Sequence, residues 1–282
     1  MKVDFHLHSH FSDGTMSPEE LVDKLAEREV AAAALTDHDS VNGCSRFHKA
    51  AADNNIASYS GVEISTLWDG LEIHVVGLNI DHTDAQLLAR LEQQRARRTE
   101  RAFAMAQRLE GAGFIKVWQG TCELAGDGVA PGRAHFARYL VESGQIASPQ
   151  KAFKRWLGQG KPAYVASQWC EMAQAVDWII QAGGYAVLAH PTRYKAGRGR
   201  RERLLKAFAE AGGHAIEIPL YNLESSEARQ VLKLTEMLQL QGGAGSDYHG
   251  AITRWIQPGV EYDRQTLPSP VWDRWIELSQ EQ

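Results

Sequence analysis

Cysteine is scarce in this sequence, and the three residues that occur are isolated. Cys44, Cys122 and Cys170 are odd in number, widely spaced and absent from any Cys-x-x-Cys pair. A disulfide framework needs paired cysteines and a zinc knuckle needs closely spaced ones, so neither is indicated. We expect these thiols to be buried or to take no part in the chemistry.

Long hydrophobic runs are also missing. No apolar stretch reaches the length of a membrane span, and the first residues include Lys2, Asp4 and three histidines where a signal peptide needs an apolar core. We therefore expect a cytoplasmic protein with no membrane contact. Nothing in the sequence points to an obligate protein partner.

Positive charge is not in excess. The 282 residues include 30 Lys and Arg against 35 Asp and Glu, which gives a net charge of −5. This balance argues against a protein that coats long nucleic acid with a broad basic face, although it leaves a local anion pocket possible. A hydrophobic content of 44% is enough for one large core with an elaboration.

The first fourteen residues carry the strongest chemical pattern. Apolar and polar residues alternate in Asp4-Phe5-His6-Leu7-His8. If residues 2–8 form a strand, His6 and His8 point to the same face, which is an arrangement suited to a metal ion. The turn-forming sequence that ends in Asp13-Gly14 then brings a carboxylate back toward the same strand end.

The rest of the chain alternates between strands and helices. A helix over 18–29 is predicted by an N-cap serine, Ser17, followed by Pro18 and by Glu20 three residues after the cap. A hairpin turn is predicted at 68–70. The remaining pattern predicts strands at 31–35, 56–63, 72–78, 185–189 and 215–220, and helices at 42–54, 173–182, up to 211, and 224–240. This alternation is typical of βαβ units in a parallel sheet or barrel.

One segment departs from this alternation. Residues 96–162 lack β-branched runs, and a long charged helix is predicted from Asp84 to about Phe114. We interpret 96–162 as a helical insertion that forms a cap domain, with 1–95 and 163–282 as the barrel domain. For the arginines of the insertion helix, a solvated face is the favoured interpretation.

Polar residues end most of the predicted strands, and in a parallel barrel such residues meet at one rim. Capping and hydrogen bonding would explain any one of them alone, but not so many together. Nine ligands are too many for one ion and suit two or three divalent metals. Histidine and carboxylate without cysteine fit Mn²⁺, Fe²⁺ or Zn²⁺, and we favour Mn²⁺ for phosphoryl chemistry. The candidate ligands are His6, His8, Asp13, His38, Glu63, His74 (in mid-strand), His190, Asp247 and His249.

These motifs resemble, in order along the chain, those of the PHP (polymerase and histidinol phosphatase) family. They are Asp4-x-His6-x-His8-Ser9, Thr36-Asp37-His38, Glu63 with His74, Ala189-His190-Pro191 and Ser246-Asp247-x-His249-Gly250. The resemblance implies a distorted (β/α)7 barrel with a trinuclear site. It assigns His6, His8, Glu63 and Asp247 to one metal, Glu63, His74 and His190 to a second, and Asp13, His38 and His249 to the third.

Within the family, two further motifs are similar to a branch of nucleotide phosphoesterases. They are Gly132-Arg133-x-His135 and His190-Pro191-x-Arg193-Tyr194. That branch contains the 3′,5′-nucleotide bisphosphate phosphatase and the 5′-to-3′ exoribonuclease RNase AM. The resemblance implies hydrolysis of the 3′-phosphoester of a nucleoside 3′,5′-bisphosphate, such as adenosine 3′,5′-bisphosphate, or of short 5′-phosphorylated RNA. The candidate substrate-binding residues are Arg133, His135, Lys161, Arg193 and Tyr194.

Other functions remain open at this point. A histidinol-phosphate phosphatase or another small-molecule phosphatase would use the same metals. A metal-dependent amidohydrolase also uses His-x-His on a barrel strand, but no carboxylated or catalytic lysine is evident near a strand end. A metal-stabilised binding module would bind metal without turnover, and a proofreading exonuclease is disfavoured because the sequence contains no polymerase segment.

Overall fold

A mixed sheet forms the centre of the protein in the computed structural model, which describes residues 1–250 and 256–276. Among these residues the strands pair in the order β8-β7-β6-β4-β3-β2-β1-β9, and β5 pairs with β3. The strands are β1 (Lys2–Asp4), β2 (Ala32–Leu35), β3 (Ala57–Trp68), β4 (Leu71–Leu78), β5 (Cys170–Glu171), β6 (Tyr185–Leu188), β7 (Ala215–Glu217), β8 (Gln241–Gly243) and β9 (Val260–Glu261).

Strand β4 interrupts an otherwise parallel arrangement of the seven strands β8 to β1. It runs antiparallel to both β3 and β6, whereas the other neighbours from β8 to β1 pair in parallel. The predicted hairpin explains this reversal, because Asp69 and Gly70 adopt the positive φ angles of 49° and 71° that a tight turn needs. The other six strands of this set therefore direct their carboxyl ends toward the same rim.

The two ends of this set of strands meet through extended segments that follow β1 and β8. The amide of Phe5 donates to the carbonyl of Ala244 at 3.1 Å, the amide of Asp247 donates to His6 at 2.9 Å, and the amide of His8 donates to Tyr248 at 3.0 Å. This closure gives the distorted barrel expected from the sequence. The predicted strand at 2–8 is correspondingly shorter, since regular pairing in β1 ends at Asp4.

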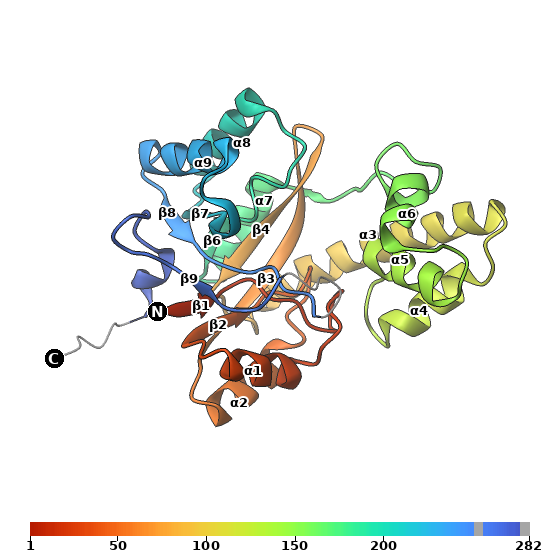
Figure 1. The fold of residues 1–282 in the computed structure, drawn as a ribbon, viewed down its shortest axis with the longest axis horizontal. Coiled ribbons are helices and arrows are strands. Elements are labelled where there is room, and N and C mark those ends of the chain that lie inside the picture. The colour runs from red at the N-terminus through yellow and green to blue at the C-terminus, as the bar shows by residue number, and fades with distance from the viewer. Residues whose placement is uncertain (251–255, 277–282) are drawn as a thin grey trace.

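Helices pack around the sheet (Figure 1). They are α1 (Pro18–Glu27), α2 (Cys44–Asp53), α7 (Met172–Gln181), α8 (Arg198–Glu210) and α9 (Ser226–Met237). Helix α1 begins as predicted: the Ser17 hydroxyl accepts from the amide of Glu20, and the Glu20 carboxylate accepts from the amide of Ser17. No helix in the described part of the chain combines the length and apolarity needed to cross a membrane.

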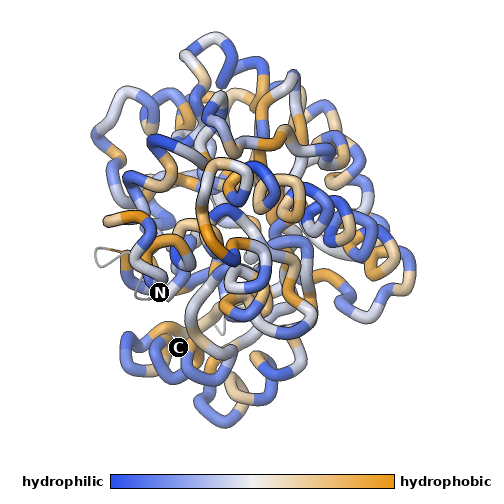
Figure 2. The backbone as a smooth tube through the Cα atoms, turned by 90° about the vertical axis from the view of Figure 1, so that its right-hand side faces the viewer, coloured by the Kyte–Doolittle hydropathy of each residue, from blue (hydrophilic) through white to orange (hydrophobic). Residues whose placement is uncertain are grey.

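The predicted insertion is helical and projects to the right of the sheet in Figure 1. It comprises most of α3 (Ala85–Gly111), with α4 (Val117–Ala125), α5 (Arg133–Glu142), α6 (Pro149–Ala152) and the π-helical turn η1 (Phe153–Leu157). Figure 2, viewed from this side, shows hydrophilic and hydrophobic residues alternating along these helices, as expected for helices buried on one face.

Helix α3 joins the insertion to the barrel without a break. Leu87 and Leu91 pack in the core beside the sheet, whereas Met105 and Leu109 pack in a separate core with Phe136 of α5. The predicted boundary at residue 96 thus falls inside one continuous helix. The division of the chain into two domains stays a prediction.

Candidate metal centre

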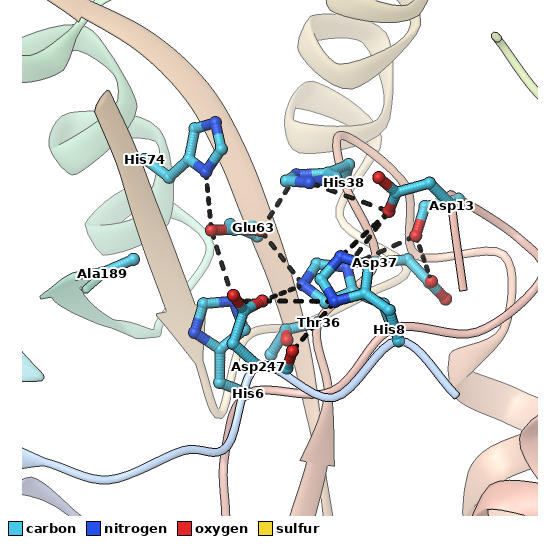
Figure 3. Close-up of polar contacts among 12 residues, drawn as sticks. His6, His8, Asp13, Thr36, Asp37, His38, Glu63, His74, Ala189 and Asp247 are labelled. Atoms are coloured by element: carbon cyan, nitrogen blue, oxygen red, sulfur yellow. Dashed lines mark hydrogen bonds and ion pairs between the residues drawn. The ribbon is translucent and has the colours of Figure 1, made fainter. Parts of the chain in front are cut away.

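The structure brings all nine candidate ligands together at the carboxyl-end rim of the sheet. Figure 3 labels His6, His8, Asp13, His38, Glu63, His74 and Asp247 among them. In a first group, Glu63 on β3 and Asp247 after β8 lie opposite the two histidines that follow β1. His6 Nε2 lies 3.3 Å from Glu63 Oε1 and from Asp247 Oδ1, and His8 Nε2 lies 3.2 Å from Glu63 Oε2 and from Asp247 Oδ1. His6 and His8 therefore share one face, as the alternation predicted.

A second group surrounds Glu63. His74 Nδ1 on β4 lies 2.8 Å from Glu63 Oε1, and His190 Nε2 after β6 lies 3.1 Å from the same oxygen. His38 Nδ1 after β2 lies 2.9 Å from Glu63 Oε2. Figure 3 shows His74 and His38 on either side of Glu63, so its two oxygens face different groups of donors. A carboxylate placed in this way is suited to bridge two ions.

A third group gathers around Asp13 in the loop after the His-x-His segment. Asp13 Oδ1 lies 3.3 Å from His249 Nε2, 3.8 Å from His38 Nε2 and 3.9 Å from His8 Nδ1. His38 thus presents one ring nitrogen to Glu63 and the other to Asp13. The resemblance placed His38 with the third metal alone, and its position between two groups is a feature that the motifs did not indicate.

Unpaired buried atoms indicate that this cluster is built for cations. Donor atoms about 3 Å apart are spaced as ligands that share one ion at bond lengths of about 2.1 Å. Buried donors without a hydrogen-bond partner are costly unless a ligand satisfies them. Within the described residues, such atoms include His6 Nε2, His8 Nε2, Asp13 Oδ1, His38 Nδ1 and Glu63 Oε2. The nitrogen and oxygen donors fit divalent metal ions.

The pKa shifts within the cluster also indicate a site for divalent cations. Burial raises the pKa of the Glu63, Asp13 and Asp247 carboxyl groups, but the surrounding histidines outweigh this effect and hold each pKa well below its usual value. Burial lowers the pKa of His38 to about 4, which keeps its imidazole neutral and able to bind metal. The three carboxylates are therefore ionised, and divalent cations would pair with their negative charge.

The backbone is strained at two of the ligands. His190 has a φ of 28° and Asp247 a φ of 56°, which is the left-handed region that residues other than glycine rarely adopt. Such conformations persist where the surrounding structure enforces them, and they are concentrated at functional sites. Here they lie in the segments that follow β6 and β8, where the side chains face the other candidate ligands.

Sequence reasoning missed Glu217, the last residue of β7. Its carboxylate lies 3.3 Å from His6 Nδ1 and accepts a 2.6 Å hydrogen bond from the amide of His190. By engaging Nδ1, Glu217 leaves His6 Nε2 free to face the other ligands. The signal was a single acid within the apolar run Ala215-Ile216-Glu217-Ile218, which places a carboxylate on a buried strand.

Two acids of the motifs shape loops instead of facing the donors. Asp37 accepts hydrogen bonds from the amide and hydroxyl of Ser9, both at 2.7 Å, and from the hydroxyl of Ser12 at 2.6 Å. Asp4 accepts from the amides of Ser246 and Gly259 at 2.9 and 2.7 Å. These contacts fix the loop of Asp13 and the segment of Asp247.

A cavity of about 300 Å³ opens beside the cluster of candidate ligands, and two of the predicted arginines line it. Its lining includes His74 and His190 from the cluster, and Arg133 from α5 with Arg193 from the loop after β6. Arg133 lies 3.0 Å from Glu72 Oε2, and Arg193 contacts Asp247 Oδ2. The helical insertion therefore contributes a cation to the rim of the barrel.

The other predicted substrate residues lie in different positions. Tyr194 lines the cavity, but its hydroxyl donates to the carbonyl of Ala189 and accepts from the amide of His74, both at 2.9 Å. His135 is buried and lines a separate cavity with Asp13 and His38. Lys161 is exposed and is not among the residues that line either cavity.

The prediction of a solvated arginine face on the insertion helix is wrong for Arg98. Its side chain is only 14% exposed, bonds the Asp39 carboxylate and the Ser65 hydroxyl, and packs over the ring of Trp169. The sequence analysis assigned this part of α3 to the insertion, away from the barrel. In the structure α3 crosses the rim, so its inward face meets polar residues of β3 and of the loop after β2.

The distorted barrel and its rim of histidines and carboxylates define a class of protein: an α/β barrel with a rim of ligands suited to divalent metal ions. The chain belongs to the PHP domain family, whose model matches residues 4–157.

Relatives of similar length support this membership. The chain is 38% identical to a 5′-3′ exoribonuclease of Haemophilus influenzae, over 97% of this chain and 98% of that protein. It is 37% identical to a 3′,5′-nucleoside bisphosphate phosphatase of Chromobacterium violaceum, over 96% and 95%. A solved structure from Chromobacterium violaceum, described as an amidohydrolase with bound sulfate and no metal, superposes with a TM-score of 0.90 at 36% identity, over 97% of this chain and 95% of that one.

Proposed function

We propose that this protein is a metal-dependent phosphoesterase that hydrolyses the 3′-phosphoester of 5′-phosphorylated nucleotides. Its substrates would be nucleoside 3′,5′-bisphosphates such as adenosine 3′,5′-bisphosphate, which yield a nucleoside 5′-monophosphate and phosphate. Short 5′-phosphorylated RNA would release 5′-mononucleotides in the 5′-to-3′ direction. The names of the two full-length relatives support both activities.

The observation that carries this proposal is the cavity that joins metal ligands to arginines. His74 and His190 form part of its wall, and Arg133 and Arg193 form another part. Guanidinium groups bind phosphate oxygens through paired, charge-assisted hydrogen bonds. A substrate with two phosphate groups would match this lining, with one phosphate on the arginines and the other toward the metals.

The arginines would decide which phosphorus reacts. With the 5′-phosphate held by Arg133 and Arg193, the phosphorus on the 3′-oxygen of the same nucleotide is the one that reaches the cluster. Both reactions then break the same bond, between phosphorus and the 3′-oxygen. Divalent ions bound by the nine ligands would supply a Lewis acid and an activated water.

Acidic partners keep these arginines in place before substrate binds. Glu72 lies beside Arg133, and Asp247 beside Arg193. A phosphate dianion offers more charge and more acceptor oxygens than one carboxylate, so it would displace these contacts. Arg193 also connects the phosphate-anchoring site with a candidate metal ligand, because it contacts Asp247.

We further propose that the ions are two or three Mn²⁺, with Fe²⁺ or Zn²⁺ as alternatives. All nine ligands donate nitrogen or oxygen, and none is a thiolate. Carboxylate and imidazole together suit Mn²⁺, and this ion is well suited to phosphoryl transfer. Metal analysis of the purified protein, followed by reconstitution with each ion, would identify the active metal.

The anchoring role is tested with Arg133→Ala and a pair of RNA pentamers that differ only in a 5′-phosphate or a 5′-hydroxyl. We expect kcat/KM for the 5′-phosphorylated pentamer to fall by about tenfold to a hundredfold, because a charged hydrogen-bond partner of phosphate is lost. Cleavage of the 5′-hydroxyl pentamer should stay unchanged.

The matched control is Arg138→Ala, which removes an arginine of the same helix that lies beside Glu142 and does not line the cavity. This variant should cleave both pentamers as the wild type does. If Arg133→Ala lowers the cleavage of both pentamers equally, or of neither, Arg133 does not bind the 5′-phosphate.

A further inference from the structure

A second cavity, of about 430 Å³, lies between helices α8 and α9 and has no part in the site described above. Its charged lining consists of Arg198, Arg201, Glu227, Arg229 and Lys233. Four cations face one carboxylate here, although the chain as a whole carries a net charge of −5. Arg198, Arg229 and Lys233 are exposed, so their charges are available to a ligand.

Two helix N-termini meet at this cavity. Helix α8 begins after Gly197, which has no side chain to cap the first turn, whereas α9 begins after Ser225, whose hydroxyl accepts from the amide of Ala228 at 3.1 Å. The first residues of both helices, Arg198 and Ser226, are part of the lining. The helix dipole favours an anion at both termini, and the first turn of α8 also offers amides that no side chain caps.

A buried arginine adds a fixed positive charge to the wall of this cavity. Arg201 is only 6% exposed, and it bonds the side chain of Gln230 at 2.9 Å and the carbonyl of Ala196 at 3.0 Å. Its Nε is buried and has no hydrogen-bond partner. The guanidinium is therefore held in the wall of the cavity, where its charge adds to that of the exposed cations.

The position of this cavity relates it to the metal centre. Arg193 and Lys195 line the cavity beside the metals, and Ala196, Gly197 and Arg198 line the basic cavity. One short loop therefore separates the two cavities. Helices α8 and α9 follow strands β6 and β7, so their N-termini lie on the same rim as the carboxyl ends of those strands (Figure 1).

We propose that this basic cavity binds phosphate groups of an RNA substrate that lie beyond the scissile phosphodiester. This inference rests on the proposed function and adds to it a second anion-binding site for longer substrates. A nucleoside 3′,5′-bisphosphate has no phosphate beyond the scissile one, and neither does a 5′-phosphorylated dinucleotide. Only a longer RNA reaches the basic cavity, which therefore favours RNA over mononucleotides.

The test is the double variant Arg198→Glu/Lys233→Glu, assayed on a 5′-phosphorylated RNA pentamer and on the 5′-phosphorylated dinucleotide. We expect kcat/KM for the pentamer to fall at least about tenfold, mainly through KM, and its salt dependence to weaken, because fewer phosphates are neutralised. The dinucleotide and adenosine 3′,5′-bisphosphate should stay within about twofold of wild type, since neither carries a phosphate beyond the scissile one. A glutamate at position 198 suits a helix N-terminus, so the fold should be retained.

The matched control is Lys24→Glu/Lys49→Glu, which makes the same change in charge on α1 and α2, away from α8 and α9 in Figure 1. This control should cleave the pentamer as the wild type does. If the test variant cleaves the pentamer normally, or loses activity on the pentamer and the dinucleotide equally, the inference is wrong. If the wild-type protein with metal cleaves none of the three substrates, it is the proposed function that fails.

Discussion

At the scale of single residues, the buried carboxylate of Glu217 determines which ring nitrogen of His6 faces the other candidate metal ligands. His6 has two ring nitrogens, and Glu217 lies 3.3 Å from Nδ1 while Nε2 points to Glu63 and Asp247. Glu217 also accepts from the amide of His190, where the backbone has a positive φ. One carboxylate outside the ligand set thus orients two ligands.

Replacing Glu217 by Gln tests this orienting role. We expect metal affinity to fall by about 10-fold to 100-fold, as for other carboxylates that hold a ligand histidine, with the fold retained. Calorimetric titration of the metal-free protein with Mn²⁺ measures the change, and circular dichroism checks the fold. Glu227→Gln, an exposed acid on α9, is the control. Unchanged Mn²⁺ affinity in Glu217→Gln would contradict the orienting role.

The nine candidate ligands could be predicted from the sequence, whereas Glu217 could not. Histidine at a strand end is rare enough to be noticed, and the His-x-His spacing places two rings on one face. Glu217 is one acid at the end of an apolar run, and its partner His6 is 211 residues away. Only the folded chain brings them together, so no local pattern could link them.

At the scale of elements, the β3–β4 hairpin and the helical insertion are joined by one carboxylate. Glu72 on β4 accepts from Arg101 of α3 at 3.1 Å and from Arg133 of α5 at 3.0 Å, and also from Tyr164 and Ser167. Burial raises the pKa of Glu72, but Arg133 and Arg101 outweigh this effect and lower it. The ion pairs of Glu72 with Arg101 and Arg133 therefore require the ionised carboxylate.

Glu72→Gln should lower the free energy of unfolding of the metal-free protein at pH 7 by about 1–3 kcal/mol, since Arg101 and Arg133 lose their charged partner. The pKa of Glu72 is lower in the fold than its usual 4.5. The contribution of ionised Glu72 to the free energy of unfolding is therefore complete above pH 4.5. It disappears as the pH falls through the pKa that Glu72 has in the folded protein. Urea unfolding of the wild type and of Glu72→Gln measures the difference in unfolding free energy at pH 7 and again at pH 3.

The control for this prediction is Glu92→Gln on α3, whose carboxylate is 69% exposed beside Arg95. Exposed pairs contribute about 0–1 kcal/mol, so this variant should change little at either pH. An equal loss of stability at pH 7 and pH 3 in Glu72→Gln would mean that packing, and not charge, is what the substitution removes.

The sequence predicted elements better than their boundaries. The capping pattern at Ser17 and the turn at Asp69-Gly70 are local, and both are confirmed. The predicted strand at 2–8 ends early because residues 5–8 bond to the segment after β8, which is distant in sequence. Arg98 was misjudged for the same reason: Asp39 and Trp169 lie far from it along the chain.

At the scale of the whole molecule, the metal centre depends on the closure of the barrel. The segment after β8 carries Asp247 and His249, and it must approach the segment of His6 and His8 closely enough for their backbones to bond. Gly245 permits this approach, because a Cβ built on it would lie 2.2 Å from the Cβ of His6 and 2.9 Å from its backbone nitrogen. Contacts this short would force backbone or ligand to move.

Gly245→Ala should therefore impair both closure and metal binding. Because the new methyl group meets the backbone and Cβ of His6, relief requires the two segments to separate, and we expect a loss of about 2 kcal/mol or more in unfolding free energy. Separation also moves His6 away from Asp247, so the metal content of the purified protein should fall. Gly111→Ala is the control, since a Cβ there meets nothing within 4 Å, and it should be neutral or stabilising. Full metal content and wild-type stability in Gly245→Ala would show that the barrel tolerates a wider junction and that closure does not set the geometry of the site.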